Sequence, residues 1–358
     1  MKIIFLLLLI VFGNCYDAKK ENPNYPLKSL FINNTINPYP IPSYSISFLS
    51  KDLPGTAVVV KKFNSTYYAL IENETNTNLL TLYTSTNALD FSSTGQTINT
   101  SNFSNTGGSI RFFFSHNSIL YYASFSNLSY YTDVNTQNIV STSTYRYYTY
   151  SNGSFSSLQT KTIPSIAGIS ASSSYDPRCI SSLNNQIILL NNSNLSSNGS
   201  TTYGNSIWTG DLQNNTFSNL TSSPSFSGPR TTPSCSQIDS TIYMYGGYKY
   251  GCSSGSCQYT DLWSSTDGSS YIKVSSNFNY FTGNLIKLNN GTFLAVSSIN
   301  SSGYKSTDNG ANWSSIVITS GSTTTGVITA SSLSVGSETD GSKVFIYSPT
   351  KVYYGTIP

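Results

Sequence analysis

Short runs of β-branched and aromatic residues recur along most of the chain and are separated by clusters of Asn, Gly and Ser. Residues 57–60, 111–114, 187–190, 242–245 and 344–347 are examples. No stretch places apolar residues at the 3.6-residue period of an amphipathic helix. Apolar runs of this length, bounded by turn-forming residues, are typical of β-strands joined as a meander. The pattern therefore predicts an all-β protein.

A longer repeat runs through these strands. In six segments a strand-like run ends in a polar turn with Asn, Asp or Gly, and an aromatic residue follows. The closing aromatics lie about 40 to 65 residues apart, which is the spacing of blades in a β-propeller. We predict a single six-bladed propeller over residues 44–358. Its expected blade units are 55–95, 107–160, 165–222, 228–276, 282–320 and 325–358.

The last unit contains three strand-like runs, so we expect its fourth strand from the beginning of the repeat region, at 44–49. Pairing the two ends of the region in one blade closes the ring and removes exposed sheet edges. Two other architectures also fit short strands with regular turns. Residues 107–160 can hold two short blades, which gives seven, and two β-sandwiches are the rival fold.

The turn at 306–313 carries the most specific motif, with the spacing Ser-x-Asp-x-Gly-x-x-Trp, and a shortened copy stands at 265–271. The Asp of such a turn accepts hydrogen bonds from turn amides, and the Gly can adopt positive φ. The Trp anchors the hairpin between sheets. We therefore interpret Asp267, Asp308, Gly310 and Trp313 as structural turn residues.

A second motif begins at Gly228-Pro-Arg230 and continues with Gly246-Gly247 and Leu262-Trp263, in the layout of a kelch repeat. Asp176-Pro-Arg178 begins a similar unit that lacks the double glycine. With the turn motif, these residues resemble secreted Asp-box and kelch-like propellers, the superfamily that includes sialidases and sortilin-type receptors. The resemblance covers residues 55–358. It implies a propeller fold, and it places the Asp-box turns at the blade periphery, away from catalysis.

The first 15 residues have the features of a signal peptide. Lys2 precedes an apolar run at 3–12 that is too short to span a bilayer, and Gly13 and Cys15 fit cleavage after Cys15. Residues 16–43 contain five prolines and predict an extended lead-in. No other apolar run approaches the roughly 20 residues of a transmembrane helix. We expect a secreted, extracellular protein.

Cysteines and glycosylation sequences agree with export. Removal of Cys15 leaves four cysteines, and an even number in an oxidising compartment indicates two disulfides. The short loop between Cys252 and Cys257 favours their pairing, which leaves Cys179 with Cys235. A zinc site is the rival interpretation, but the chain has a single His and no C-x-x-C pair. The predicted N-glycosylation sites are Asn33, Asn64, Asn73, Asn127, Asn152, Asn194, Asn219, Asn290 and Asn300.

Composition narrows the range of partners. Charged residues make up 9% of the chain and the net charge is +3, so nothing favours a nucleic acid or an acidic membrane surface. We expect no cofactor and no metal. The predicted partner is a glycan or an extracellular protein.

Arg111, Arg178 and Arg230 stand at the beginnings of predicted inner strands, which crowd around one end of the central channel in a propeller. Guanidinium groups there can bind a carboxylate, sulfate or phosphate with paired hydrogen bonds. We therefore predict these three arginines as ligand-binding residues. The alternative is that each arginine packs on a neighbouring aromatic ring or caps backbone carbonyls.

No catalytic residues are predicted. A sialidase has an Arg before Ile-Pro in its first strand, and Ile41-Pro42 lacks that Arg. Glycosidases also need two facing carboxylates, and the sequence suggests no convincing pair. We predict a non-enzymatic extracellular protein that presents a propeller face to a glycan or protein ligand. The alternative is a divergent sialidase-like glycoside hydrolase, and a structural matrix or coat component is a third hypothesis.

Overall fold

The computed structural model describes most of the repeat region. The described residues are 44–103, 110–132, 139–163, 175–197, 200–211, 214, 216–221, 225–226, 230–231, 233–249, 258–278, 284–296, 302–320 and 336–356. The predicted signal peptide and lead-in, at 1–43, lie outside these ranges, as do Cys252 and Cys257. Residues Tyr44–Pro358 belong to one compact unit.

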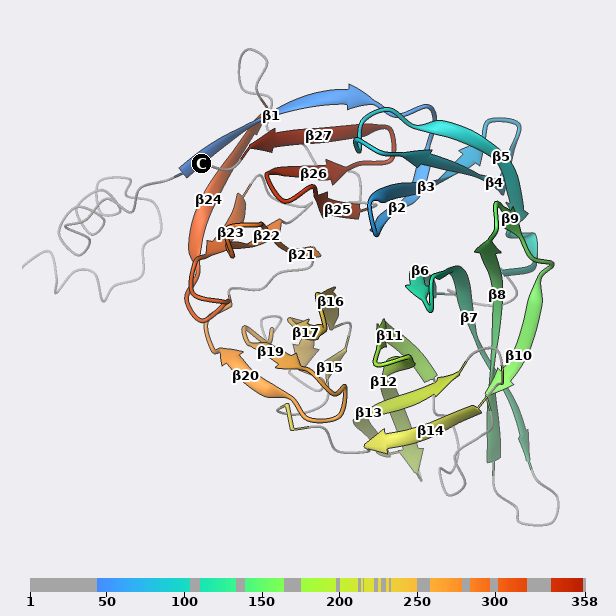
Figure 1. The fold of residues 1–358 in the computed structure, drawn as a ribbon. Helices are drawn as coiled ribbons and strands as arrows, with labels where there is room; N and C mark the ends of the chain where they lie inside the picture. Colours follow the sequence, from blue (N-terminus) through green and yellow to red (C-terminus); the bar gives the residue numbers. More distant parts are fainter. Residues whose placement is uncertain are drawn as a thin grey trace, which may run out of the picture. The chain divides into compact units, whose positions relative to one another are not determined.

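Six radial β-sheets surround a central axis, so the protein is a six-bladed propeller (Figure 1). Within the described ranges the one helical element is a 3₁₀ turn at Ser101–Phe103. The predicted all-β, six-bladed fold is confirmed. Both alternatives are wrong, because residues 110–163 form one sheet and the sheets stand around a ring instead of in two stacked pairs.

The first three blades are antiparallel meanders in chain order. Blade 1 contains β2 (Ala57–Phe63), β3 (Thr66–Asn73), β4 (Asn76–Ser85) and β5 (Ser92–Asn99). Blade 2 contains β6 (Ile110–His116), β7 (Ile119–Thr132), β8 (Ile139–Ser151) and β10 (Gln159–Ile163), and the short β9 (Ser154–Phe155) pairs with β8. Blade 3 contains β11 (Tyr175–Leu183), β12 (Gln186–Ser197), β13 (Ser200–Asp211) and β14 (Thr216–Thr221).

The last three blades keep this plan with shorter strands. Blade 4 contains β16 (Ser234–Ile238), β17 (Thr241–Tyr245), β19 (Leu262–Ser265) and β20 (Ile272–Ser275), beside a small ribbon of β15 (Arg230–Thr231) and β18 (Tyr248–Lys249). Blade 5 contains β21 (Asn284–Lys287), β22 (Phe293–Val296), β23 (Ser302–Ser306) and β24 (Ser314–Ser320). Blade 6 contains β25 (Gly336–Thr339), β26 (Lys343–Tyr347), β27 (Lys351–Thr356) and β1 (Tyr44–Asp52).

Strand β1 closes the ring. Its second half pairs antiparallel with β27, through Leu49–Asp52, as the fourth strand of blade 6. Its first half, Tyr44–Phe48, pairs in parallel with β24 of blade 5. The sequence predicted the closing strand at 44–49, which is the half with alternating apolar residues. The residues that pair with blade 6 are more polar, so the hydrophobic pattern did not mark them.

Apolar side chains fill the spaces between neighbouring blades. Separate clusters lie between blades 1 and 2, blades 2 and 3, blades 3 and 4, and blades 6 and 1. A larger cluster extends across blades 4, 5 and 6 and includes Phe48 of β1. Sheets that pack face to face in this way bury one set of alternating side chains on each side. The core is therefore a ring of interfaces around the axis.

The first strand of each blade lies innermost. Around the ring, β2 contacts β6, β6 contacts β11, β11 contacts β16, β16 contacts β21, β21 contacts β25 and β25 returns to β2. These six inner strands stand around the central axis (Figure 1), and we call the space that they enclose the axial channel.

Candidate functional site

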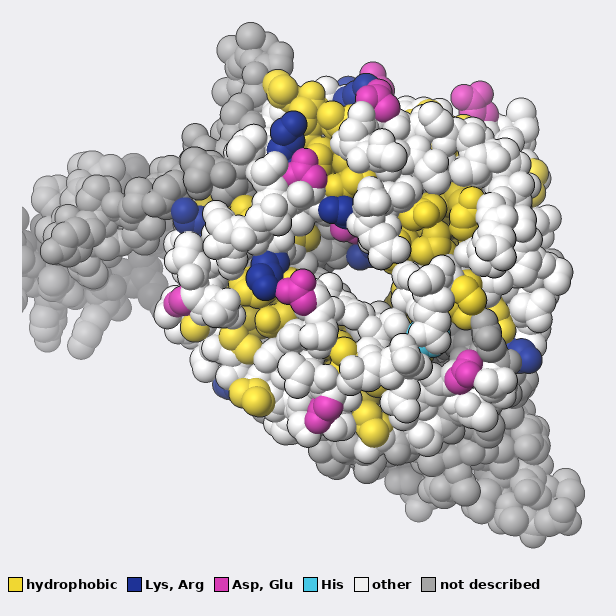
Figure 2. All heavy atoms as spheres, viewed as in Figure 1, with side chains coloured by type: hydrophobic (Ala, Val, Ile, Leu, Met, Phe, Trp, Pro, Cys, Tyr) yellow, Lys and Arg dark blue, Asp and Glu magenta, His cyan; other side chains and the backbone are white. Residues whose placement is uncertain are grey.

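The axial channel is the main candidate site. Figure 2 shows an opening at the centre of the molecule, with basic and acidic side chains beside it. A cavity of about 890 Å³ lies along the second half of the inner strands and their following turns. A neighbouring cavity of about 380 Å³ shares Lys61, Asp239 and Glu338 with it. We call this region the channel mouth. Its lining includes Lys61, Lys62, Phe63, Asn64, Phe112, Phe113, Asn117, Ser182, Ser236, Gln237, Asp239, Glu338 and Thr339, with Lys287 in the smaller cavity.

Oppositely charged side chains stand in pairs at the channel mouth. Lys61 of β2 lies 3.9 Å from the carboxylate of Glu338 on β25. Lys287 lies 2.9 Å from Asp239, in the turn after β16. Lys62 donates to the backbone carbonyl of Thr339 at 2.8 Å. The mouth therefore offers hydrogen-bond donors and acceptors side by side with little net charge.

The electrostatic surroundings of the two carboxyl groups differ. Burial raises the pKa of Glu338, and the charges of Lys61 and Lys62 oppose that rise without cancelling it. Asp239 is mostly exposed, with its side chain 73% accessible. A hydrogen bond to this carboxylate raises the pKa of Lys287, which keeps the pair charged over a wider pH range. The site thus contains a shielded acid on one side and a solvated ion pair on the other.

Aromatic rings support the channel mouth between blades 1 and 2. Phe113 on β6 packs edge-to-face on Phe63 of β2, with ring centroids 5.3 Å apart. Phe112 and Phe114, on the other face of the same strand, pack toward blade 3. Three consecutive aromatics on an inner strand can therefore serve two blade interfaces and still contribute to the channel lining.

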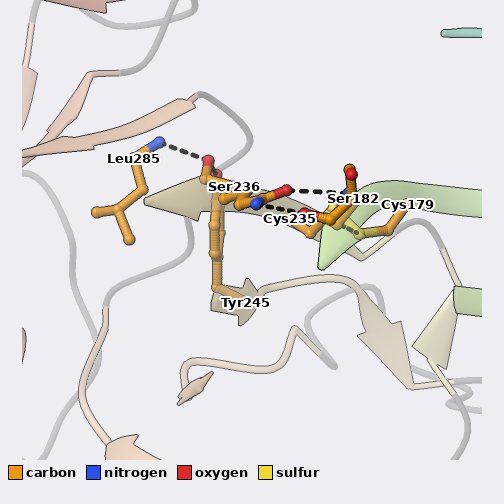
Figure 3. Close-up of a disulfide and its surroundings, with 8 residues drawn as sticks. Cys179, Ser182, Cys235, Ser236, Tyr245 and Leu285 are labelled. Atoms are coloured by element: carbon orange, nitrogen blue, oxygen red, sulfur yellow. Dashed lines mark hydrogen bonds between the residues drawn. A yellow bond between two sulfur atoms is a disulfide. The ribbon is translucent and has the colours of Figure 1, made fainter. Parts of the chain in front are cut away.

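Covalent and polar contacts connect the inner strands of blades 3, 4 and 5 (Figure 3). The predicted disulfide between Cys179 and Cys235 is confirmed and joins β11 to β16, with 5.7 Å between the Cα atoms. Beside it, the Gln237 side chain accepts from Ser182 N at 3.0 Å and donates to Ser182 O. Ser236 Oγ accepts from Leu285 N of β21 at 3.0 Å. This part of the channel wall is therefore held together by a covalent bond and hydrogen bonds in addition to the apolar cluster between blades 3 and 4.

His116 lies at the end of β6, against β11. Its Nδ1 shares a 2.8 Å hydrogen bond with Ser182 Oγ, and its Nε2 lies 3.2 Å from Asn117 Nδ2. Because an amide nitrogen can only donate, Nε2 is the acceptor and Nδ1 carries the proton. Burial lowers the pKa of His116, so the neutral ring is favoured. Both ring nitrogens of His116 are therefore hydrogen-bonded within the channel wall.

The predicted arginine site is not assembled as expected. Arg230 lies in β15, outside the inner strand of blade 4, and it is fully buried. Its guanidinium pairs with both carboxylate oxygens of Asp261, at 2.5 and 2.7 Å, and stacks on Tyr259 at 4.0 Å. Burial alone would raise the pKa of Asp261, but hydrogen bonds from Arg230 and its charge hold it below the usual value. The ligand-binding role predicted for Arg230 gives way to a structural one, which was the alternative interpretation.

The other two arginines lie on inner strands, as the sequence suggested. Arg111 is the second residue of β6, and Arg178 lies at an irregularity in the pairing of β11 with β12. Their side chains lie outside what the structure describes. Their role in ligand binding stays a prediction.

The predicted turn residues make local contacts. Asp308 Oδ1 accepts from Ser306 Oγ at 2.7 Å and from Asn312 N at 2.9 Å, and Trp313 Nε1 donates to Gly310 O at 2.7 Å. The backbone hydrogen bond from Asn312 is the main reason that the pKa of Asp308 falls to about 2. Gly310 has φ +90°, which favours glycine.

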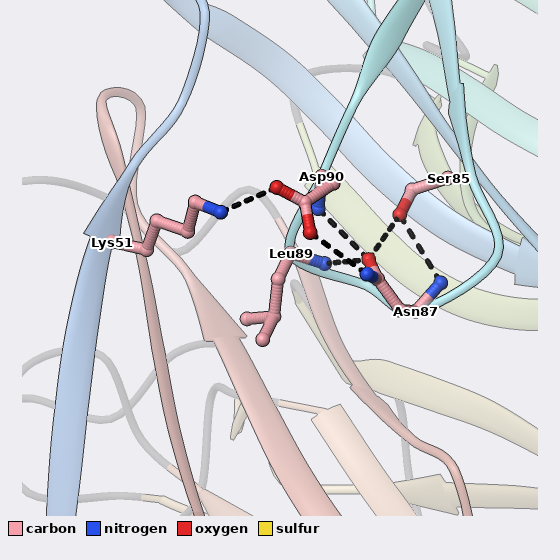
Figure 4. Close-up of polar contacts among 5 residues, drawn as sticks. All are labelled: Lys51, Ser85, Asn87, Leu89 and Asp90. Atoms are coloured by element: carbon pink, nitrogen blue, oxygen red, sulfur yellow. Dashed lines mark hydrogen bonds and ion pairs between the residues drawn. The ribbon is translucent and has the colours of Figure 1, made fainter.

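The same arrangement recurs in two less complete copies. Asp267 Oδ1 accepts from the amides of Ser269 and Ser270, both at 2.8 Å. In blade 1, Asn87 takes the place of the Asp and accepts from the amides of Leu89 and Asp90 (Figure 4). Asp90 also pairs with Lys51 of the closing strand β1. These contacts are those of turn-fixing residues, and none of the four predicted ones lines the channel mouth.

Of the predicted glycosylation sites, Asn64, Asn73, Asn152 and Asn290 have described side chains, and all lie in turns or at strand ends. Asn33 and Asn300 lie outside the described residues, as do the side chains of Asn127, Asn194 and Asn219.

Sequence reasoning missed the charged pairs of the channel mouth. None of the four residues, Lys61, Asp239, Lys287 and Glu338, belongs to a motif. One signal was available: each lies within or directly after the first strand of its blade, toward the end of that strand. Residues at this place in successive blades meet around the axis of a propeller.

The described part of the chain offers no metal site and no membrane-spanning helix. There, no three His, Cys, Asp or Glu side chains form a group that could hold a metal ion. No helix in these ranges has the length and apolar character needed to cross a membrane.

Comparison with known proteins gives distant structural likeness. The sequence matches no protein-family profile and no curated protein. Among solved structures, it is similar to an α-L-arabinanase of Penicillium chrysogenum complexed with arabinobiose, with 12% identity and a TM-score of 0.47 over 88% of this chain and 97% of that one. It is also similar to an α-L-arabinofuranosidase of Fusarium graminearum, with 8% identity and a TM-score of 0.44 over 88% of this chain and 98% of that one. A sialidase of Trypanosoma rangeli is similar with 10% identity and a TM-score of 0.45, over 87% of this chain and 55% of that one. At such identities the likeness concerns the fold alone.

Proposed function

We propose that the protein is an exported binding protein that holds a carbohydrate at the channel mouth. The observation that carries this proposal is the pairing of charges there: Lys61 with Glu338 and Lys287 with Asp239. A site for a strongly charged ligand would present unpaired charges of one sign. Here the ion pairs leave a polar surface that favours a neutral, hydrogen-bonding ligand.

Carbohydrate hydroxyls match this surface because each both donates and accepts. At the mouth, lysine ammonium groups donate, carboxylates accept, and the side chains of Ser182 and Asn117 can do both. Phe63, which is half-buried, adds apolar area on which the C–H face of a sugar ring can pack. The volume of about 890 Å³ is large enough for a small oligosaccharide.

A glycan array with purified full-length protein tests the proposal. We expect binding to a defined subset of glycans and loss of that binding in Lys61→Met and Glu338→Gln. Lys351→Met is the matched control, because Lys351 lies on β27 and its side chain is 46% exposed in an ion pair with Asp52. The proposal fails if no glycan binds, or if the control variant loses binding as much as the channel variants do.

Glycoside hydrolysis is the second candidate function, because Glu338 and Asp239 line the same two cavities. Glycosidases combine one carboxyl group that holds its proton with a second, ionised one. The raised pKa of Glu338 fits the general acid, and the solvated Asp239 fits the ionised partner. Turnover of fluorogenic glycosides, abolished in both Glu338→Gln and Asp239→Asn, would favour the enzyme. Array binding without turnover would eliminate it.

A further inference from the structure

One predicted glycosylation site lies at the channel mouth itself. Asn64-Ser65-Thr66 is an acceptor sequence in the turn between β2 and β3. Asn64 is exposed and lines the cavity together with Lys61 and Lys62. Among the acceptor asparagines with described side chains, it is the one that lines either cavity. The others in that group are Asn73, Asn99, Asn152, Asn214, Asn290 and Asn312.

The local structure leaves the Asn64 amide available. Its φ of 56° lies in the left-handed region, which Asn tolerates in tight turns. No described residue forms a hydrogen bond with its side chain. By contrast, the amide oxygen of Asn73 accepts from Thr75, and Asn312 Nδ2 donates to Asp308 at 2.7 Å. A glycan on Asn64 would therefore break no side-chain hydrogen bond among the described residues.

A tethered glycan at this position would have an advantage over any free one. A ligand linked by a short flexible tether reaches an effective concentration on the order of millimolar at the site it borders. A channel mouth that accepts carbohydrate would therefore meet the sugar of its own chain first. Lys61 lies three residues before Asn64 on β2, and its ion-pair partner Glu338 lies on the adjacent inner strand β25. Both line the same cavity as Asn64.

We propose that Asn64 carries an N-glycan that lies across the channel mouth and covers the Lys61–Glu338 pair. This inference rests on the proposed function, since it requires export and a mouth that accommodates sugar. The glycan acts as an intramolecular occupant, and an outside glycan must displace it. Forms of the protein without it would bind external glycans more tightly.

Amine labelling tests directly whether the Asn64 glycan shields Lys61. Full-length protein, made in a host that glycosylates secreted proteins, is acetylated with a water-soluble N-hydroxysuccinimide ester, and each lysine is read by peptide mass spectrometry. Thr66→Val removes the acceptor sequence while keeping a β-branched residue in β3, and Thr66→Ser retains it. Ser154→Ala removes the Asn152 site, on the β8–β9 turn outside the cavity lining. Lys351 serves as the internal reference.

We expect labelling of Lys61, relative to Lys351, to rise several-fold in Thr66→Val and to stay unchanged in Thr66→Ser and Ser154→Ala. Endoglycosidase treatment of folded wild-type protein should give the same rise without any substitution. The inference is overturned if Asn64 is unoccupied while other sites are occupied, or if Lys61 labelling does not change when the Asn64 glycan is removed. If no acceptor site carries a glycan, export itself is refuted and the proposed function falls as well.

Discussion

Two joints between neighbouring blades are built in opposite ways. Blades 3 and 4 are linked covalently by Cys179–Cys235, and the Gln237 side chain adds two hydrogen bonds across the same joint. Blades 6 and 1 close the ring without a described disulfide. There the backbones approach so closely that a Cβ on Gly336 would lie 2.2 Å from the carbonyl oxygen of Val60.

The difference follows from where the joints lie in the sequence. The residues at the joint of blades 3 and 4 are near each other in the chain, so a cross-link there limits the unfolded state of one segment. Blades 6 and 1 come from opposite ends of the propeller, and their joint forms only when all six blades are in place. Its strength depends on backbone fit and on strand β1, which pairs with blades 5 and 6 and contacts blade 1 through Lys51.

The largest expected effect is on the closing joint. Gly336→Ala places a methyl group against the Val60 carbonyl, and backbone atoms on both sides cannot yield cheaply. We expect the free energy of unfolding in urea to fall by about 4 kcal/mol or more. Gly95→Ala is the control, because an added Cβ there meets nothing within 4 Å. Only the positive φ of Gly95 then lowers the free energy of unfolding, by about 1–2 kcal/mol. Equal losses in both variants would show that close approach at Gly336 does not limit ring closure.

The second prediction removes the covalent joint. The double substitution Cys179→Ala and Cys235→Ala opens a link across a sequence separation of 56 residues. Chain-entropy arguments give a loss of about 4 kcal/mol for a loop of this size. Because the apolar cluster between blades 3 and 4 remains, we expect the double variant still to fold. A loss below about 1 kcal/mol would mean that this cluster and the Gln237 hydrogen bonds hold the joint without the disulfide.

The third prediction, with a smaller expected effect, compares the stability lost when polar contacts are removed at each of the two joints. Gln237→Met removes both hydrogen bonds to the Ser182 backbone, and Lys62→Met removes one hydrogen bond to Thr339 O. We expect losses of about 1 kcal/mol for each, with Gln237→Met the larger. Thermal unfolding of both variants beside wild type measures the difference. A larger loss for Lys62→Met would indicate that the closing joint depends more on its polar contacts than the disulfide joint does.

The smallest effect is the pH dependence of the closing joint. Burial raises the pKa of Glu338 in the folded protein, so its folded state holds the proton more tightly than the unfolded chain does. The free energy of unfolding therefore falls as pH rises from the ordinary carboxyl range through the raised value. Glu338→Gln removes this term, and the variant should gain stability over wild type at neutral pH. The two should converge in acid, where Glu338 is protonated in both states. Urea unfolding across this pH range would contradict the prediction if the variant were less stable at neutral pH.

The sequence by itself determined the fold class and the blade count. Strand-forming runs, turn residues and closing aromatics are local signals, and each blade is a local meander, so their spacing was sufficient. It also predicted the Cys179–Cys235 pair, because these two cysteines remain once Cys252 and Cys257 are paired across their short loop.

The tertiary structure decided the site. Lys61 and Glu338 meet only because the last blade closes onto the first, and nothing near either residue indicates the other. Arg230 was interpreted as a ligand residue from its expected place at the beginning of an inner strand, and only the tertiary packing brought Asp261 and Tyr259 around it. Local patterns encode strands and turns through short-range sterics and hydrogen bonding, whereas a charged pair across the ring depends on distances that exist only after six blades have assembled.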